Sequence, residues 1–73
     1  MKNNNDSTYD VVIYHIDTRR VEKIVGKNMK RHGRYNSAER RLDTALSRIN
    51  DDYYARIVPS GKCKVGNVLP EVP

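Results

Sequence analysis

The chain has 73 residues, which is enough for one small domain and leaves no room for two. Its 14 Lys and Arg residues against nine Asp and Glu residues give a formal net charge of +5, which favours an anionic partner. A single cysteine excludes an intrachain disulfide and a Cys-rich zinc site and is typical of a reducing cytoplasm, and no apolar run approaches the roughly 18 residues of a membrane span.

Both ends of the chain are polar or rich in proline. Residues 1–8 include three consecutive Asn residues, and residues 70–73 hold two of the three prolines. We expect a disordered tail over 1–8 and a loose tail over 70–73, around a single domain at 9–69. A domain of this size buries only roughly 60% of its unfolded surface, so homo-oligomerisation often adds stability.

Two segments rich in β-branched and aromatic residues open the domain. Residues 9–16 read Tyr-Asp-Val-Val-Ile-Tyr-His-Ile and predict a central strand, because both of their faces are largely apolar. Residues 17–20 predict a turn, and residues 21–25 alternate weakly and predict a second strand. Together they form a β-hairpin, which Gly26 is expected to close.

A ten-residue loop over 26–35 leads into a predicted helix. Asn36 is expected to cap this helix, with Glu39 three residues later at the spacing of a capping box. Apolar residues then recur at steps of 4, 3, 1 and 3, which predicts one apolar stripe on a 3.6-residue helix. The stripe consists of Ala38, Leu42, Ala45, Leu46 and Ile49. Residues 50–52 are expected to end the helix.

The last part of the domain predicts more β-structure. Residues 53–58 predict a third strand, residues 59–61 a turn, and residues 62–65 a short fourth strand. The order ββαββ lets the third strand pair antiparallel beside the first, in the spatial order 2-1-3-4. We therefore expect an α+β fold of two layers, with one helix packed on one face of an antiparallel sheet of three or four strands.

All of the net charge lies in one 15-residue stretch, residues 27–41. Glu39 is the only acid in this stretch, and the rest of the chain is neutral. Its cations are Lys27, Lys30, Arg31, Arg34, Arg40 and Arg41. Such local charge is typical of a site for an anionic surface. The alternative is a solvated loop and helix face whose arginines pair locally, for example Arg40 with Asp43.

The basic loop meets the predicted helix N-terminus. Free backbone N–H groups and the positive end of the helix dipole favour an anion there. Arg40 and Arg41 are unfavourable near that end by about a few tenths of a kcal/mol each, which indicates a role in holding phosphate or carboxylate. Tyr35 lies in the same stretch, and we expect it to stack on a base.

The tyrosines suggest a second surface. Tyr53 and Tyr54 point to opposite faces of one strand, so one of them must point away from the helix. An open sheet face that carries this Tyr beside Lys23 and Arg56 is a candidate binding surface. Ordinary cross-strand packing is the favoured interpretation, because aromatic pairs commonly stabilise sheets.

The remaining reactive residues indicate no catalysis. His15 and His32 have no carboxylate at a recognisable spacing, and the chain has no Gly-rich phosphate loop, paired-carboxylate motif or metal-ligand cluster. We interpret His15 as structural, His32 as solvated or a phosphate contact, and Cys63 as a small, partly buried strand residue. A non-enzymatic protein without cofactor or metal is expected. A small ribonuclease that uses His32, Tyr35 and nearby arginines is a weaker alternative.

Three segments resemble small accessory proteins of temperate bacteriophages and prophages. They are residues 23–29, 38–42 and 47–50, and the resemblance extends in style over residues 9–69. It implies a short, early-acting protein in the cytoplasm of a bacterial host that binds nucleic acid, host enzymes or defence complexes. The resemblance assigns no role to any single residue.

These observations predict a small binding module whose basic loop and helix N-terminus contact an anionic surface, most simply a nucleic-acid backbone. The expected contact residues are Lys27, Lys30, Arg31, Arg34, Tyr35, Arg40 and Arg41. Phosphate contacts alone carry no sequence information, so weak or shape-dependent specificity is expected. The alternative is a phage-type inhibitor that binds an acidic surface of a host nuclease or defence complex.

Overall fold

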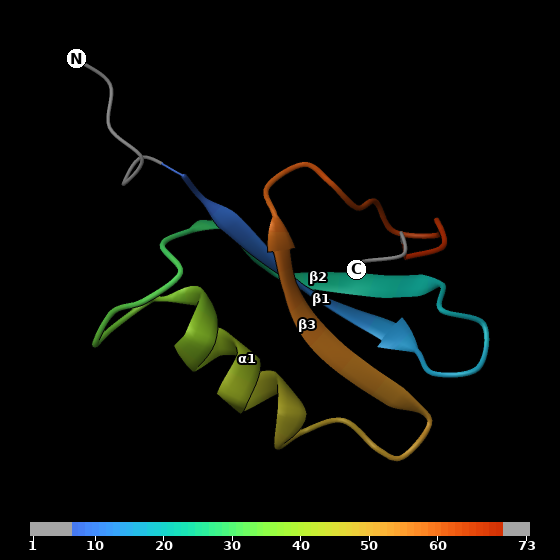
Figure 1. Ribbon diagram of the computed structural model, residues 1–73. Helices are drawn as coiled ribbons and strands as arrows, with labels where there is room; N and C mark the ends of the chain where they lie inside the picture. The colour runs from blue at the N-terminus through green and yellow to red at the C-terminus, as the bar shows by residue number, and fades with distance from the viewer. Residues whose placement is uncertain (1–6, 70–73) are drawn as a thin grey trace.

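The computed structural model describes residues 7–69. Its elements follow in the order β1 (Tyr9–His15), β2 (Val21–Met29), α1 (Ala38–Leu46) and β3 (Tyr53–Pro59). The strands form one antiparallel sheet in the order β2-β1-β3, and α1 covers one face of it (Figure 1). The α+β class, the central position of the first strand and the single covering helix are confirmed.

The helix face of the sheet carries the first apolar cluster. Ile13 of β1 and Ala55 of β3 are buried against Ala45 of α1, and Leu42 and Ile49 pack at the margin. Ala45, Leu42 and Ile49 belong to the predicted apolar stripe, which confirms the face that the helix turns to the sheet. Ile49 lies beyond the last residue of α1, so the stripe outruns the helix.

The opposite face of the sheet carries a second apolar cluster. Val12, Val21 and Val58 are buried there together with Cys63 and Leu69. Since Cys63 and Leu69 follow β3, the segment over 60–69 folds back over this face. The predicted open face is therefore partly covered.

The segment over 60–69 is not the predicted fourth strand and does not lie beside β3. It reaches the start of β2, where the Val21 N–H donates to the Asn67 carbonyl at 2.8 Å and the Gly66 N–H donates to the Val21 carbonyl at 2.8 Å. An isolated antiparallel bridge joins Arg20 to Val68. The position predicted for a fourth strand is therefore wrong.

Two glycines explain why this segment turns instead of extending. Gly61 and Gly66 adopt φ angles of 79° and 92°, a conformation that side chains with a Cβ rarely adopt. The chain turns at both positions. Cys63, between the two glycines, and Leu69, after the second, are both buried. Burial of these two side chains offsets the lost strand pairing.

β2 is longer than predicted, since it continues through Gly26 to Met29. Gly26 lies opposite Val11 and below α1, where a Cβ would come within 2.6 Å of the Met29 Sδ and 3.1 Å of the Arg41 Cγ. The glycine thus permits the close approach of helix and sheet and does not end the strand. The loop predicted for 26–35 is confined to residues 30–37.

The helix begins one residue later than predicted. Ser37 is the N-cap, and its Oγ accepts the Arg40 N–H at 3.2 Å and donates to the Gly33 carbonyl at 3.0 Å. Asn36 instead adopts a left-handed φ of 51° in the preceding loop. The predicted capping box is wrong because Ser37 is the N-cap, which leaves Arg40 and not Glu39 three residues later, and the Glu39 side chain contacts His32 instead.

The predicted tails fall mainly on residues 1–6 and 70–73, which lie outside the described residues. Thr8 extends the pairing of β1 with β3: its carbonyl accepts the Ser60 N–H at 3.2 Å and its hydroxyl donates to the Ser60 Oγ at 2.8 Å. Within 7–69, no helix has the length and apolarity needed to cross a membrane.

Candidate nucleic-acid interface

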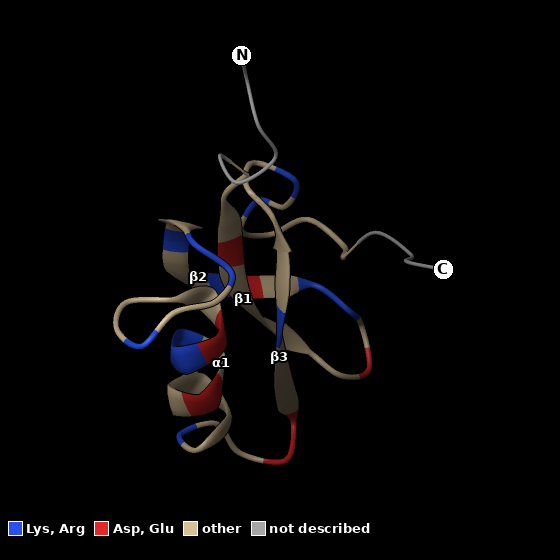
Figure 2. Cartoon of the chain, turned by 60° about the vertical axis from the view of Figure 1, so that its left-hand side comes forward, with Lys and Arg blue, Asp and Glu red and all other residues tan. Residues whose placement is uncertain are grey.

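The predicted contact residues are exposed, but they do not form one compact cluster. Lys27 lies on β2, Arg40 and Arg41 lie on α1, and the others lie on the loop over 30–37. Figure 2 shows Lys and Arg positions distributed over this loop and α1. Tyr35 is 77% exposed, so its ring is accessible for stacking.

The first turn of α1 offers no free backbone N–H group. The Ala38 N–H donates to the Lys30 carbonyl at 2.6 Å, and the Glu39 N–H donates to the Arg31 carbonyl at 3.1 Å. The Arg40 N–H donates to Ser37, as described above. The expectation that free N–H groups bind an anion here is therefore wrong, and side chains must supply the contacts.

Arg31 points away from the other cations. Its guanidinium carbon lies 5.5 Å from the centre of the Tyr9 ring, within the range of a cation–π contact. Arg31 also lines a shallow groove beside Ala55 and Ile57, which places it on the β3 side of the molecule. It is separated from the helical arginines and belongs to a different surface.

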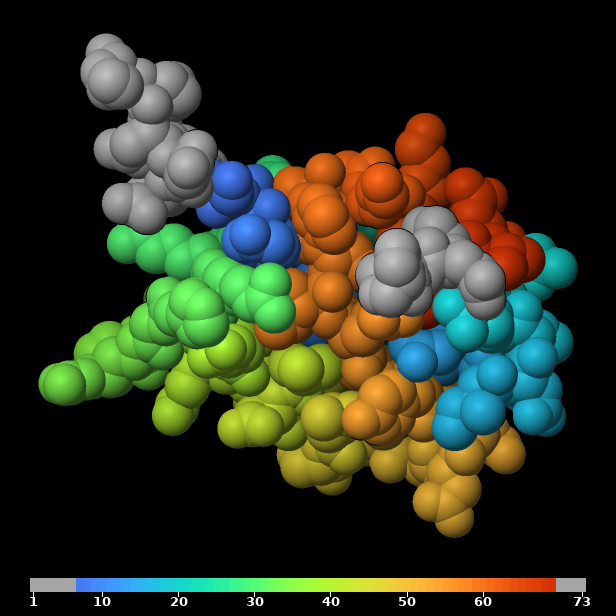
Figure 3. Space-filling view, viewed as in Figure 1, coloured from blue at the N-terminus to red at the C-terminus, as the bar shows by residue number. Residues whose placement is uncertain are grey.

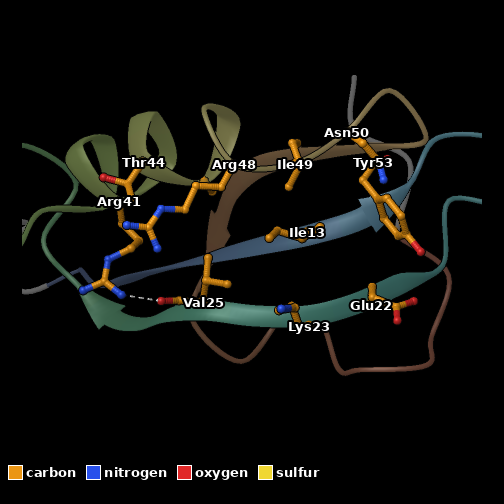
Figure 4. A pocket seen from close by; sticks show the side chains of 11 residues that line it. Ile13, Glu22, Lys23, Val25, Arg41, Thr44, Arg48, Ile49, Asn50 and Tyr53 are labelled. Carbon is orange, nitrogen blue, oxygen red and sulfur yellow. Dashed lines mark hydrogen bonds between the residues drawn. The ribbon is translucent and has the colours of Figure 1, made fainter.

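A groove of about 590 Å³ separates α1 from β2 (Figure 4). Its apolar lining comes from both layers and consists of Ile13, Val25, Ala45 and Ile49. The Tyr53 ring lies at one end of the groove in Figure 4. The groove is therefore concave, apolar inside and bounded by an aromatic ring.

Three cations line this groove. Arg41 and Arg48 come from the helical side and are seven residues apart, about two helical turns, so they lie on one side of the helical segment. Lys23 faces them from β2. In Figure 4 both guanidinium groups extend toward the end of the groove opposite Tyr53. Among the described lining residues, Glu22 is the only acid.

Arg41 is held in place by the sheet. Its Nη1 donates to the Val25 carbonyl at 2.7 Å, a bond drawn in Figure 4. A guanidinium has five N–H donors, so this bond leaves donors for a ligand. Arg41 is thus a fixed cation at the mouth of the groove, and an anion bound there meets a group that is already oriented.

Comparison with known proteins identifies no relative. No protein-family model, no curated protein and no solved structure matches the chain. The function must therefore be inferred from the shape and charge of the surface.

Sequence reasoning missed Arg48 and misplaced Lys23. The seven-residue spacing from Arg41 to Arg48 was the signal available for the first. Lys23 and Arg56 were expected on one face, but Lys23 pairs with Ile13 and Arg56 pairs with Val12, so they lie on opposite faces of the sheet. That candidate surface is wrong.

The histidines make local contacts. His32 Nδ1 lies 2.9 Å from the Glu39 Oε2, a carboxylate partner that the sequence spacing did not reveal, and both side chains are exposed. His15 packs edge-on against Tyr53 with ring centres 5.2 Å apart, and its Nδ1 accepts the Asp17 N–H at 3.3 Å. These contacts fit the structural interpretation of His15.

Cys63 is buried, but it lies in the segment over 60–69 and not on a strand. Burial raises the pKa of its thiol above the usual value, nearby Asp10 raises it further, and Arg56 and Lys62 lower it in part. The thiol is thus a protonated core group. Over residues 7–69, no cluster of three or more His, Cys, Asp or Glu side chains could hold a metal ion.

Proposed function

We propose that the protein is a non-enzymatic module that binds single-stranded nucleic acid along the basic side of α1. The observation that supports this function is the groove between α1 and β2, where Arg41, Arg48 and Lys23 surround an apolar lining. Guanidinium groups hold phosphate oxygens with paired N–H donors. Apolar and aromatic side chains in the same groove accept the face of a base.

The shape of the groove favours a single strand over a duplex. In a duplex the bases are stacked inside the helix, so only phosphates would reach the rim. In a single strand the bases can turn outward onto the apolar lining and the Tyr53 ring. The exposed Lys27, Arg34 and Arg40 extend the positive surface beyond the groove, along the path of a longer strand.

Binding should be weakly specific and strongly dependent on salt. Contacts to phosphate position a nucleic acid but do not read its sequence. Each neutralised phosphate releases condensed counterions, so affinity falls steeply as salt rises. Fluorescence anisotropy with labelled random-sequence DNA and RNA oligonucleotides over a salt series measures both properties.

The variant Lys23→Gln/Arg48→Gln removes two exposed cations that line the groove and tests the localised site. Loss of two phosphate contacts should lower the slope of log affinity against log salt by about 1.4 for a single strand. The matched control is Lys62→Gln/Lys64→Gln, which removes the same charge from exposed positions beyond β3. If both variants weaken binding equally, net charge alone attracts the nucleic acid and the localised site is refuted.

Tyr35→Ala tests stacking separately from charge. Because the ring is exposed, its removal should leave the fold intact and weaken binding by about 1–3 kcal/mol without changing the salt slope. Unchanged affinity would remove Tyr35 from the site. Absence of any nucleic-acid binding at low salt would contradict the proposed function and favour the inhibitor of an acidic host protein.

A further inference from the structure

The outer edge of β3 has unpaired backbone groups, and the pairing with β1 shows which ones. The Ile16 N–H donates to the Asp52 carbonyl at 3.0 Å, and the Ser60 N–H donates to the Thr8 carbonyl at 3.2 Å. Hydrogen-bonded positions alternate along an antiparallel pair, so the even-numbered residues of β3 bond to β1. The odd-numbered residues, Tyr53, Ala55, Ile57 and Pro59, direct their backbone groups to the outer edge.

Two of these N–H groups have no acceptor among the described residues. The Tyr53 N–H donates to the Asn50 carbonyl at 3.2 Å, but the N–H groups of Ala55 and Ile57 have no such partner. Ala55 is only 2% exposed, so water hardly reaches its backbone. A buried polar group without a partner is destabilising, and an added strand would supply the missing bonds.

This edge is bordered by long side chains, and because Ala55 is 2% exposed, the side chains beside it must move aside before a strand can pair there. A shallow groove of about 410 Å³ runs beside it, with Arg31 and Leu42 on the helix side and Tyr54 and Arg56 on the other. Figure 3 shows β3 reaching the surface between α1 and the segment over 60–69. An uncovered edge strand is a template for pairing with another chain.

We infer that β3 pairs antiparallel with β3 of a second copy of this chain, which joins two three-stranded sheets into one of six strands. The two-fold axis passes beside Ala55, so Ala55 faces its counterpart. Tyr54 then lies opposite Arg56 of the second copy, and Tyr53 lies opposite Ile57. The edge groups of Ala55 and Ile57 gain partners in this register.

The side chains favour this register over its neighbours. Tyr54 and Arg56 form a cation–π pair across the interface on one face, and Tyr53 and Ile57 form an apolar pair on the helix face. Centring the pair on Arg56 would place two like charges opposite each other, which is destabilising. Centring it on Ile57 would place Pro59, which lacks an N–H, opposite Ala55.

Charge complementarity at the ends also favours a second copy as the occupant. In this register the turn with Asp51 and Asp52 comes alongside the Pro59 end of the other β3. Arg31 lies at that end, over Tyr9, which pairs with Pro59. The acidic turn of each copy therefore approaches Arg31 of the other copy.

Sedimentation equilibrium on nucleic-acid-free protein tests the dimer. The apparent mass should rise from 8.5 kDa towards twice that value between micromolar and millimolar concentration. Ile57→Lys puts a charge on the paired edge and should weaken dimerisation about tenfold or more. Val65→Lys is the matched control: it adds the same charge at a 59% exposed apolar position off the edge, and should leave dimerisation unchanged.

Amide hydrogen exchange supplies a readout that needs no variant. Exchange at Ile57 and Ala55 should slow as the concentration rises, whereas Arg56, whose N–H bonds to β1, should not change. A wild-type chain that stays monomeric up to millimolar concentration overturns the inference. A dimer that Ile57→Lys leaves intact also overturns it. So does a dimer in which exchange at Ile57 is unaffected, since the contact would then lie elsewhere on the molecule.

Discussion

Asp10 is a buried carboxylate that connects three parts of the chain. It is 1% exposed, and its Oδ1 accepts the Asn28 N–H at 2.8 Å and the Ser60 hydroxyl at 3.2 Å. Its Oδ2 accepts the Gly61 N–H at 3.1 Å. Asn28 of β2 has a left-handed φ of 54°. The Asp10 carboxylate therefore holds this residue and the turn after β3, and its role is structural.

Asp10→Ala should destabilise the fold by about 3 kcal/mol, because it leaves the N–H groups of Asn28 and Gly61 without an acceptor. That loss is large for a domain of this size. The urea midpoint measures it. Asp43→Ala, at an exposed helix position, is the control and should change stability by no more than about 0.5 kcal/mol. Equal midpoints for the two variants would contradict this role of Asp10.

The Cys63 thiol predicts a loss of stability at alkaline pH. Burial raises its pKa in the folded state, so the unfolded chain loses the thiol proton first as pH rises. The folded state then binds more protons, and the free energy of unfolding falls from about pH 9 until the folded thiol also ionises. The melting temperature should fall with rising pH in the wild type more steeply than in Cys63→Ala, and thermal melts over this pH range measure the difference.

At the scale of elements, the start of α1 depends on Ser37 and not on the residue before it. Ser37 is buried and both donates and accepts a hydrogen bond, whereas Asn36 supplies a left-handed turn. Asn and Ser are both good caps, so sequence preference could not choose between adjacent positions. The fold of the loop over 30–37 made the choice.

Ser37→Ala should cost about 1 kcal/mol or more, because the Arg40 N–H loses its acceptor. Asn36→Gly keeps the left-handed backbone accessible and should leave stability almost unchanged. Chemical denaturation followed by circular dichroism measures both. A larger loss in Asn36→Gly than in Ser37→Ala would return the cap to Asn36.

At the scale of the whole molecule, the two faces of the sheet are covered by different means. α1 covers one face, and the segment over 60–69 covers part of the other through Cys63 and Leu69. The Leu69 N–H also donates to the Arg19 carbonyl at 2.6 Å. Closure of the second apolar cluster thus depends on a segment without regular secondary structure.

Leu69→Ala should cost about 2–4 kcal/mol and speed alkylation of the Cys63 thiol, since both side chains belong to the same cluster. Val68→Ala is the control at the neighbouring position, where the side chain is 56% exposed, and it should change neither property much. Thermal melting and reaction with a thiol reagent are the measurements. Equal thiol reactivity in both variants would show that Leu69 does not close this face.

The charge pattern predicts an anionic partner, but it did not locate the groove between α1 and β2. The stretch over 27–41 is contiguous in sequence, but the fold divides it: Arg31 lies beside β3, whereas Arg41 lines the groove beside β2. Arg48 and Lys23, outside that stretch, join Arg41 there. A site made by several elements depends on how they pack, which linear charge density does not encode.

The sequence by itself determined the features that rest on local periodicity. β-Branched and aromatic runs predicted β1 and β3, and the 3.6-residue stripe predicted the face that α1 buries, because these patterns act within one element. Only the tertiary structure decided the passage of β2 through Gly26, the path of residues 60–69 and the free edge of β3. Each of these depends on contacts between residues far apart in the chain, where close approach and burial outweigh local preference.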